Sequence, residues 1–287
     1  MSAYGLLQLH ELMSFDRHRA ESEILQRATN VYLGDHTALA RILGRYKLYV
    51  DTRDRGFGSH ILLDGFWEIW LTLFCLRNVK PGMTIVDVGA NFGYYSVLLA
   101  ELAGPSGKLI AVEPNPHAAD FLRRSVDLNG LLHRTRLERI ALGNVQQGRA
   151  ALYVPLSEPK NALVVPASFV AQPELGAVID VPVTTLDQLC AADARIDFIK
   201  IDAEGAEEAI FTGMKNCISK HQPLVVIEFN ASRYTDVETF VDQLVDVYGS
   251  LRRVDFSGMA VSVTREELLS KDVGEDLLLV LSRERPT

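Results

Sequence analysis

An acidic residue and a glycine-containing turn follow a short apolar stretch, and this is the most specific feature of the sequence. Residues 84–90 read TIVDVGA with Asp87 inside them, and Gly89 and Gly93 enclose a turn that contains Asn91. Glycine permits a positive backbone φ and the close approach of a ligand. The second and third glycines of a dinucleotide fingerprint are absent, and no Gly-Lys-Ser/Thr phosphate loop follows. The turn therefore predicts a ligand without a pyrophosphate.

A second carboxylate ends the next apolar stretch, which reads KLIAVE. Glu113 lies 26 residues after Asp87, and Pro114 and Pro116 stiffen the turn that presents it. A carboxylate at the tip of the second strand of such a unit accepts hydrogen bonds from the ribose hydroxyls of a nucleoside. A lone glutamate at a strand end is often only solvated, but its spacing from the glycine turn favours a nucleoside-containing ligand.

Two later apolar stretches also end in polar side chains. Asp202 and Glu204 follow the fourth stretch, and Glu228 and Asn230 close the fifth. Polar side chains at the end of an apolar sheet cost free energy unless they have hydrogen-bond partners. Three interpretations of this cluster stay open. Asp202 or Glu204 is a general base for a hydroxyl nucleophile. Alternatively, Asp202, Glu228 and Asn230 form an oxygen-ligand Mg²⁺ site. In the third interpretation, Asp202 and Glu204 cap the next helix and bind a cofactor amino group.

One histidine upstream of the glycine turn is a further candidate. The charge of an imidazole changes near neutral pH, so His60 is a candidate general base. A lone histidine is more often a surface residue or one whose hydrogen bonds are already satisfied, and the sequence leaves both interpretations open.

The elements that must position these residues alternate between strands and helices. The pattern predicts strands at 84–90, 108–113, 136–142, 196–202, 223–229, 250–256 and 277–281, and helices at 67–78, 93–102, 118–129, 206–217 and 237–248. This alternation predicts βαβ units with right-handed crossovers and a parallel sheet covered on both faces. Ligands of such sheets bind beyond the carboxyl ends of the strands, which is where the polar residues fall.

The N-terminal part of the chain does not follow that alternation. Residues 1–45 have apolar residues at helical spacing, and residues 46–66 read as strand and turn. We therefore predict an N-terminal arm over residues 1–66 and a main domain over residues 67–287. The arm packs on its own domain or on a second subunit of a homo-oligomer, and it would cover the substrate in the first case.

A second irregular region lies inside the main domain. Residues 143–195 contain no long helical pattern, and strands are expected at 150–154 and 181–184. Four prolines punctuate the loop-like segment between them. A connection of this length is usually functional or disordered. We predict that this region either lines the acceptor site or forms a loop on the surface.

Composition excludes several classes of protein. The chain has 287 residues, a net charge of −8 and 48% hydrophobic residues, which are globular values. The acidic balance argues against a nucleic-acid partner. No stretch approaches the roughly 20 apolar residues of a membrane helix. Three widely spaced cysteines argue against a disulfide framework and favour a reducing compartment. We expect a cytoplasmic protein without a membrane or nucleic-acid partner.

The glycine turn and Glu113 together resemble class I S-adenosylmethionine-dependent methyltransferases, and a longer set of segments resembles the FkbM family. In chain order these segments are VKPGMTIVDVGANFGYYSVLLAELAGPSGKLIAVEPNP, LRRSVDLNG, VTTLDQL, IDFIKIDAEGAEEAIFTGM and PLVVIEFN. They cover roughly residues 50–230. The resemblance implies an α/β, Rossmann-like fold, with a seven-stranded, mostly parallel sheet and helices on both faces. Its seventh strand would run antiparallel between the fifth and sixth, and here an N-terminal helical arm is added.

The resemblance also implies S-adenosylmethionine as methyl donor, and usually an oxygen nucleophile on a sugar or small metabolite. It assigns the cofactor turn to Asp87, Gly89, Asn91 and Gly93, the ribose ligand to Glu113, and the adenine position to Ala141 and Leu142. Asp202, from the interpretations above, completes the candidate cofactor contacts. An acidic or amide side chain is common near the adenine in class I enzymes, and Asn144 is the one nearby in this sequence. Trp67 and Glu68 match the aromatic-Glu pair of the family's upstream segment, which could fold over the cofactor mouth.

These observations predict an O-methyltransferase that acts on a hydroxyl of a carbohydrate or small polyhydroxy metabolite. The candidate catalytic residues are Asp202, Glu204 and His60, and the candidate substrate contacts are Glu68, Glu228 and Asn230. One alternative is a catalytically silent methyltransferase-like scaffold that binds a nucleoside and docks through the N-terminal arm. The other is a nicotinamide-dependent Rossmann oxidoreductase, which the missing third glycine opposes.

Overall fold

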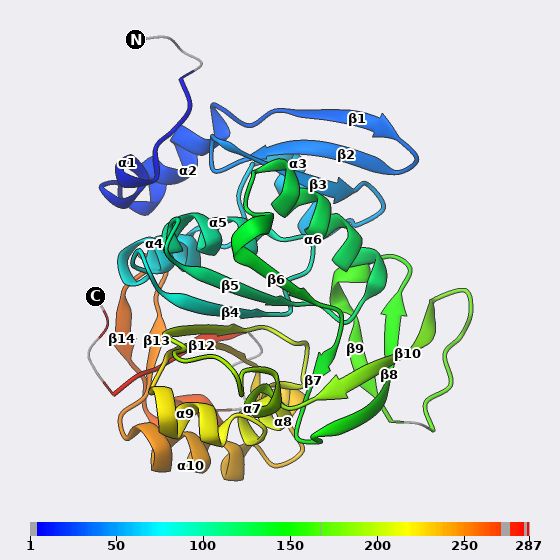
Figure 1. Ribbon diagram of the computed structural model, residues 1–287, viewed down its shortest axis with the longest axis vertical. Coiled ribbons are helices and arrows are strands. Elements are labelled where there is room, and N and C mark those ends of the chain that lie inside the picture. Colours follow the sequence, from blue (N-terminus) through cyan, green and yellow to red (C-terminus); the bar gives the residue numbers. More distant parts are fainter. Residues whose placement is uncertain (1–4, 167, 271–275, 284–285, 287) are drawn as a thin grey trace.

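A large mixed sheet forms the centre of the computed structural model, which describes the chain except residues 1–4, 167, 271–275, 284–285 and 287. Its strands follow the order β14-β13-β15-β12-β11-β4-β5-β6 (Figure 1). The strands are β4 (Thr84–Val88), β5 (Lys108–Val112), β6 (Thr135–Glu138), β11 (Phe198–Ile201), β12 (Leu224–Phe229), β13 (Arg252–Val254), β14 (Ala260–Ser262) and β15 (Leu277–Leu281).

The order and direction of these strands confirm the predicted class I arrangement. Strands β6, β5, β4, β11 and β12 pair in parallel, and β15 runs antiparallel between β12 and β13. The one addition among the described residues is β14, which pairs antiparallel with β13 at the edge and makes eight strands where seven were expected.

Helices cover both faces of this sheet, because its central strands are apolar on both faces. Ile85 packs into one hydrophobic core and its neighbour Val86 into the other, as the period-two alternation of a strand requires. Figure 1 shows α4 (Ile69–Asn78), α5 (Tyr94–Ala103) and α6 (Pro116–Leu128) on one face. On the other face lie α7 (Leu186–Leu189), α8 (Glu207–Thr212), α9 (Lys215–His221) and α10 (Val237–Tyr248). The remaining short helix, α11 (Arg265–Leu269), follows β14.

The helix predicted over residues 206–217 is two helices in the structure. It breaks at Gly213, where a Cβ would lie 2.0 Å from the backbone oxygen of Gly143. The carboxylate of Asp187 then accepts hydrogen bonds from the backbone N–H groups of Asn216 and Cys217 and caps the second helix. The close backbone approach and the new cap explain the interruption.

Of the helical pattern predicted over residues 1–45, residues 1–4 lie outside the described part of the chain, and the rest is correct only for two short helices. Helices α1 (Leu9–Met13) and α2 (Arg17–Leu25) are followed by an antiparallel sheet of β1 (Asn30–Gly34), β2 (Thr37–Ile42) and β3 (Tyr46–Asp51). Alternate residues of β2 are buried, which is the period of a strand. Helix α3 (Phe57–Leu63), in the segment expected to be strand and turn, was not predicted.

This N-terminal part packs on its own domain, which was one of the two predicted arrangements. Helices α1 and α2 contact α4, and β3 contacts α6. Leu12 and Ile24 are fully buried and belong to the same hydrophobic core as Leu71. Side-chain hydrogen bonds reinforce the contact, since Asn129 of α6's C-terminal end bonds to the backbone N–H and C=O of Lys47.

The irregular region 143–195, together with residues 141–142 before it, forms a second, smaller sheet beside the main one. Its strands are β7 (Ala141–Leu142), β8 (Gln147–Pro155), β9 (Leu163–Val165) and β10 (Gly176–Thr184), in the order β7-β10-β8-β9. The two strands expected there lie inside β8 and β10, which form a long antiparallel pair. A short 3-10 helix, η2 (Pro159–Asn161), connects β8 to β9.

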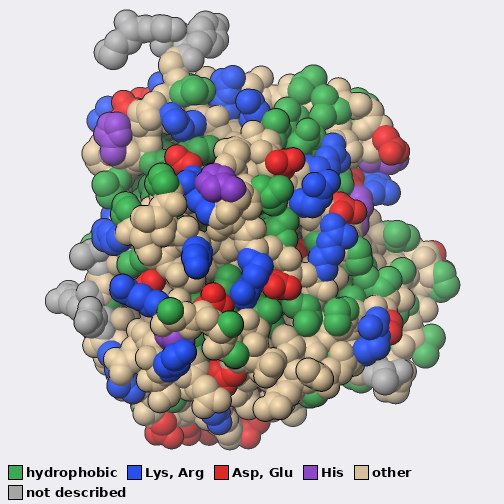
Figure 2. All heavy atoms as spheres, in the orientation of Figure 1, with side chains coloured by type: hydrophobic (Ala, Val, Ile, Leu, Met, Phe, Trp, Pro, Cys, Tyr) green, Lys and Arg blue, Asp and Glu red, His purple; other side chains and the backbone are tan. Residues whose placement is uncertain are grey.

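The surface carries both signs of charge. On the face shown in Figure 2, basic and acidic side chains are interspersed, and hydrophobic side chains gather over the small sheet. Among the exposed hydrophobic residues of that sheet and its loops are Leu156, Phe169 and Leu175. Within the described ranges, the helices are too short or too polar to cross a membrane.

Candidate active site

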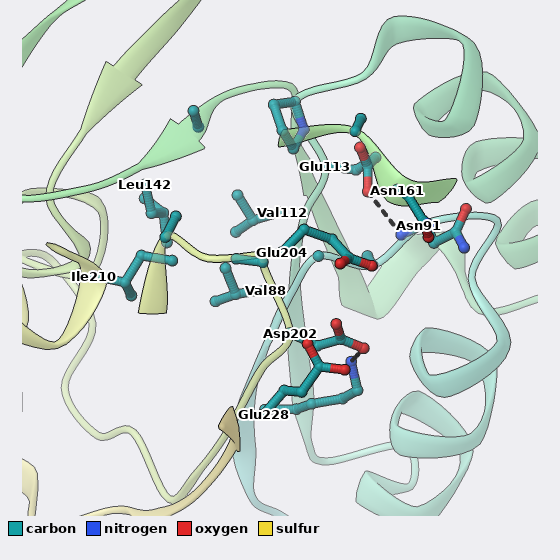
Figure 3. A pocket seen from close by; sticks show the side chains of 18 of the residues that line it. Val88, Asn91, Val112, Glu113, Leu142, Asn161, Asp202, Glu204, Ile210 and Glu228 are labelled. Carbon is teal, nitrogen blue, oxygen red and sulfur yellow. Dashed lines mark hydrogen bonds and ion pairs between the residues drawn. The ribbon is translucent and has the colours of Figure 1, made fainter. Parts of the chain in front are cut away.

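A deep cleft lies at the carboxyl ends of the central parallel strands (Figure 3). The space between its walls, with the open mouth included, is about 1310 Å³. Figure 3 shows the apolar side chains of Leu142 and Ile210 on one side of the cleft, and the carboxylates of Asp202, Glu204 and Glu228 together on the other, which we call its acidic end. The carboxylates of Glu68 and Asp276 also belong to the lining, as do apolar side chains that include Val88, Val112, Ile140 and Leu152. The cleft thus combines an apolar slot with a strongly acidic region.

The glycine turn forms part of the cleft wall, as predicted. Gly89 has a φ of +73°, and a Cβ there would lie 1.7 Å from the backbone oxygen of Asp202. The close approach that requires glycine is therefore made by the neighbouring strand end rather than by a ligand. Gly93 has a φ of +98° and begins α5 against Leu122, behind the lining of the cleft.

Asn91 connects this turn to the second strand. Its φ is +49°, and its backbone N–H donates a 2.8 Å hydrogen bond to Glu113 (Figure 3). The side-chain Oδ1 of Asn91 is buried and has no hydrogen-bond partner among the described residues. A buried acceptor of this kind calls for a donor from outside the chain.

Glu113 is buried at the tip of β5 and lines the cleft. One carboxylate oxygen accepts from Asn91 N–H and the other from Asn115 N–H, each at 2.8 Å. Burial raises the pKa of Glu113 to about 7, although these two hydrogen bonds act in the opposite direction. Each oxygen still has a free lone pair, so the carboxylate can accept two further hydroxyl groups.

Asp87 lies beneath the turn and is not one of the residues that line the cleft. Its Oδ2 accepts a 2.6 Å hydrogen bond from the Ser96 hydroxyl in α5. Burial raises the pKa of Asp87, against the influence of Lys200, whose ammonium lies 4.0 Å from Oδ1. Asp87 therefore connects β4 to α5, on the side of the turn that faces away from the cleft.

Lys200 is a lining residue that sequence reasoning did not select. Its side chain is 3% exposed, and its Nζ lies 3.0 Å from Asp202 Oδ2 and 5.0 Å from the centre of the Tyr95 ring. Burial alone would lower the pKa of Lys200, but the charges of Asp202 and Asp87 raise it. The sequence could have indicated Lys200, because it is a lysine within an apolar strand. It also lies two positions before Asp202, and residues two apart in a strand share a face.

Arg233 is a second missed residue, and it gathers three carboxylates around one cation. It lies in η3 (Ala231–Arg233) and forms ion pairs with Glu228, with Glu204 at 3.3 Å and with Asp276 at 3.2 Å. Burial and the charge of Asp202 raise the pKa of Glu228, which Arg233 opposes. No motif in the sequence distinguishes this arginine.

The structure does not bring every predicted residue into the cleft. Glu68, the candidate substrate contact, and Ala141, the candidate cofactor contact, are among its lining residues. His60 is exposed on α3, pairs with Asp64 at 2.8 Å and lies outside the lining, so its position does not support a role as base. Asn144 is also exposed and outside the cleft.

The arrangement of Asn230 does not support the predicted magnesium site. Its amide donates to Asp276 at 2.7 Å and its Oδ1 accepts from Ser232, so both polar atoms are engaged, and it is not a lining residue. Arg233 occupies the position beside Glu228. Among the residues that the structure describes, no group of three or more His, Cys, Asp or Glu side chains is placed to hold a metal ion.

Comparison with known proteins supplies independent evidence. The family described as the methyltransferase FkbM domain matches residues 87–257. A protein-L-isoaspartate O-methyltransferase of Methanopyrus kandleri is 32% identical over 110 residues, which cover 38% of this chain and 47% of the relative. The 2-O-methyltransferase NoeI of Sinorhizobium fredii is 28% identical over 181 residues, covering 58% of this chain and 68% of NoeI.

The extent of these matches is limited. The chain spans about half the length of the isoaspartate methyltransferases that it matches. Among solved structures, the methyltransferase FkbM from Methylobacillus flagellatus is similar with a TM-score of 0.44 and 18% identity, over 69% of this chain and 43% of that one.

Proposed function

The chain belongs to the FkbM methyltransferase family, and we propose that it transfers a methyl group from S-adenosylmethionine to a hydroxyl of a sugar or small polyhydroxy metabolite. One observation carries this proposal. Glu113, a carboxylate at the strand end where a ribose would bind, lines the same cleft as the group of carboxylates around Asp202. Such a cleft suits a nucleoside-containing donor and a hydroxyl-rich acceptor in contact with each other.

The residues of the cleft fit the methyl donor. Glu113 has free acceptor positions for the two ribose hydroxyls, and the buried Oδ1 of Asn91 lacks a donor among the described residues. Ala141 and Leu142 would form an apolar wall for the adenine. When bound, S-adenosylmethionine supplies an electrophilic methyl group on its sulfonium sulfur.

Asp202 is the proposed general base. Its side chain is 28% exposed in the cleft and is held by the buried ammonium of Lys200. Asp202 would accept the proton of the acceptor hydroxyl, or orient that hydroxyl, which contributes typically 10²–10⁴ in rate. Alignment of the two reactants in one cleft contributes more, about 7–11 kcal/mol for well-oriented groups.

The charge of the cleft supports a particular class of acceptor. Five carboxylates besides Glu113 line it, whereas Lys200 and Arg233 are the cations among the lining residues. Carboxylates accept hydrogen bonds from hydroxyl groups and repel anions. The acceptor is therefore an uncharged or cationic polyhydroxy compound. The name of the similar NoeI, a 2-O-methyltransferase, supports oxygen as the accepting atom.

Incubation with S-adenosylmethionine that carries a labelled methyl group tests this function. The panel of acceptors contains neutral sugars, amino sugars and sugar phosphates. We expect label in a neutral or amino sugar, lost on treatment of the protein with excess S-adenosylhomocysteine. A protein that binds the cofactor but labels no hydroxyl acceptor would favour the silent scaffold instead.

A further inference from the structure

The small sheet contributes a wall to the end of the cleft where Glu113 lies. Asn161, Ala162 and Val164 of this region are lining residues. The Asn115 amide donates a 3.4 Å hydrogen bond to the backbone oxygen of Pro159, which ties η2 to the turn that presents Glu113. Figure 3 shows Asn161 at the same end of the pocket as Glu113, away from Asp202.

The orientation of the Asn161 amide is determined by its neighbour. Its Nδ2 donates a 2.9 Å hydrogen bond to an oxygen of the Glu158 carboxylate, a group that has acceptor atoms only. The Oδ1 atom therefore points away from Glu158. It is buried and has no hydrogen-bond partner among the described residues. Leaving such an acceptor unpaired costs about 1–3 kcal/mol, so a donor from a ligand or water is expected there.

The groups around this end of the cleft are acceptors as well. The Glu113 carboxylate has free lone pairs, and the buried Oδ1 of Asn91 also lacks a partner in the described part of the chain. When Glu113 is ionised, its carboxylate and the two amide oxygens are all acceptors, and each needs a donor. A ligand that presents several donors close together would satisfy them, and the two adjacent hydroxyls of a ribose have that chemistry.

We propose that Asn161 Oδ1 accepts a hydrogen bond from a ribose hydroxyl of the methyl donor, and that the 143–195 region is therefore part of the cofactor site. This inference rests on the proposed function, in which the donor is S-adenosylmethionine. This ribose contact is distinct from the adenine contact, for which the sequence offered Asn144, a residue that lies outside the cleft.

Calorimetric titration with S-adenosylhomocysteine tests the assignment without any turnover. Asn161→Leu keeps the number and branching of the side-chain heavy atoms and removes the acceptor, together with the Nδ2 donor to Glu158. We expect it to weaken binding about five- to tenfold, the loss of one neutral hydrogen bond. Asn144→Leu, an exposed amide in the same region, should bind as the wild type does. If Asn161→Leu does not fold, Asn161→Ser is the second variant, since its side chain is too short to reach the same point.

The 2′,3′-dideoxy analogue of S-adenosylhomocysteine identifies the partner group. It lacks the ribose hydroxyls, so the wild type and Asn161→Leu should bind it equally. Wild-type affinity of Asn161→Leu for S-adenosylhomocysteine itself would overturn the inference and leave the proposed function intact. An undiminished effect of the substitution on the dideoxy analogue would also overturn it. Failure of the wild type to bind S-adenosylhomocysteine would contradict the proposed function as well.

Discussion

The ammonium nitrogen of Lys200 lies 3.0 Å from a carboxylate oxygen of Asp202, at the end of the fourth strand of the parallel series. The same nitrogen is 4.0 Å from Asp87, which is fully buried in the sheet. One buried cation therefore links a carboxylate of the core to a carboxylate that lines the cleft. Lys200 connects the stability of the fold to the position of the proposed base.

Removal of this cation should destabilise the protein. Lys200→Met leaves the buried carboxylate of Asp87 without its counter-charge, which costs about 3–5 kcal/mol for a buried pair. We expect this loss in urea denaturation at neutral pH, with Lys215→Met, an exposed lysine, as the control. Because protonation of Asp87 would remove the unpaired charge, part of the loss should be recovered in acid. Equal stability of both variants would contradict the role of Lys200.

Substitution of the proposed base should separate catalysis from cofactor binding. Asp202→Asn is expected to lower kcat by a factor of about 10²–10⁴, because a general base is lost. The dissociation constant of S-adenosylhomocysteine should change little. Glu204→Gln is the comparison, and its effect should be smaller because that carboxylate is paired with Arg233 at 3.3 Å. Full turnover by Asp202→Asn would remove this residue from the mechanism.

The stability contributed by Glu113 should fall as the pH rises. Burial raises its pKa from an ordinary 4.5 to about 7. Between these values the folded protein keeps the proton that the unfolded chain releases, so the contribution is complete below pH 4.5 and is lost as pH approaches 7. Relative to Glu113→Gln, the wild type should lose about 3 kcal/mol over this window. Urea denaturation at several pH values checks this, and a difference that does not vary with pH would contradict it.

Cofactor binding should show the opposite dependence on pH. Ionised Glu113 accepts hydrogen bonds more strongly than the neutral acid. The affinity of the wild type for S-adenosylhomocysteine is therefore expected to rise between pH 5 and pH 7 and then to level off, as the pKa of about 7 requires. Glu113→Gln should bind weakly at every pH. A wild-type affinity that is independent of pH would show that the Glu113 carboxylate does not contact the ligand.

Arg233 should control which acceptors are used. It is ion-paired with Glu204, Glu228 and Asp276, so Arg233→Leu increases the negative charge of the acidic end. The ratio of kcat/KM for an amino sugar to that for its neutral counterpart should rise roughly tenfold, as one charge a few ångströms away predicts. Arg265→Leu, whose ion pair with Asp242 lies on the surface, is the control. An unchanged ratio would contradict the electrostatic account of acceptor choice.

The sequence predicted the central sheet well, because its strands are buried on both faces. Near-continuous β-branched runs such as residues 84–88 have few other structures available. The N-terminal hairpin was missed for a physical reason. Residues 37–43 place apolar side chains at spacings that suit a helix, and they become a strand through pairing with β1 and β3 on either side. Tertiary pairing of this kind is not visible in a local pattern.

The candidate site was predictable where it depends on strand ends. Glu113 and Asp202 follow directly from the alternation of strands and helices, and both line the cleft. Arg233 and Asn161 enter from two 3-10 helices, η3 and η2, so only the three-dimensional arrangement brings them there. For His60 the sequence left a surface position open as one of two interpretations, and α3 exposes this residue and pairs it with Asp64.

Calorimetric titration of the purified protein with S-adenosylhomocysteine, with NAD as the control ligand, shows whether the cleft binds the methyl donor. We expect one binding site per chain, a dissociation constant on the order of micromolar, and no binding of NAD. Binding of NAD, or no binding of S-adenosylhomocysteine at saturating concentration, would contradict the assignment of the cleft to S-adenosylmethionine.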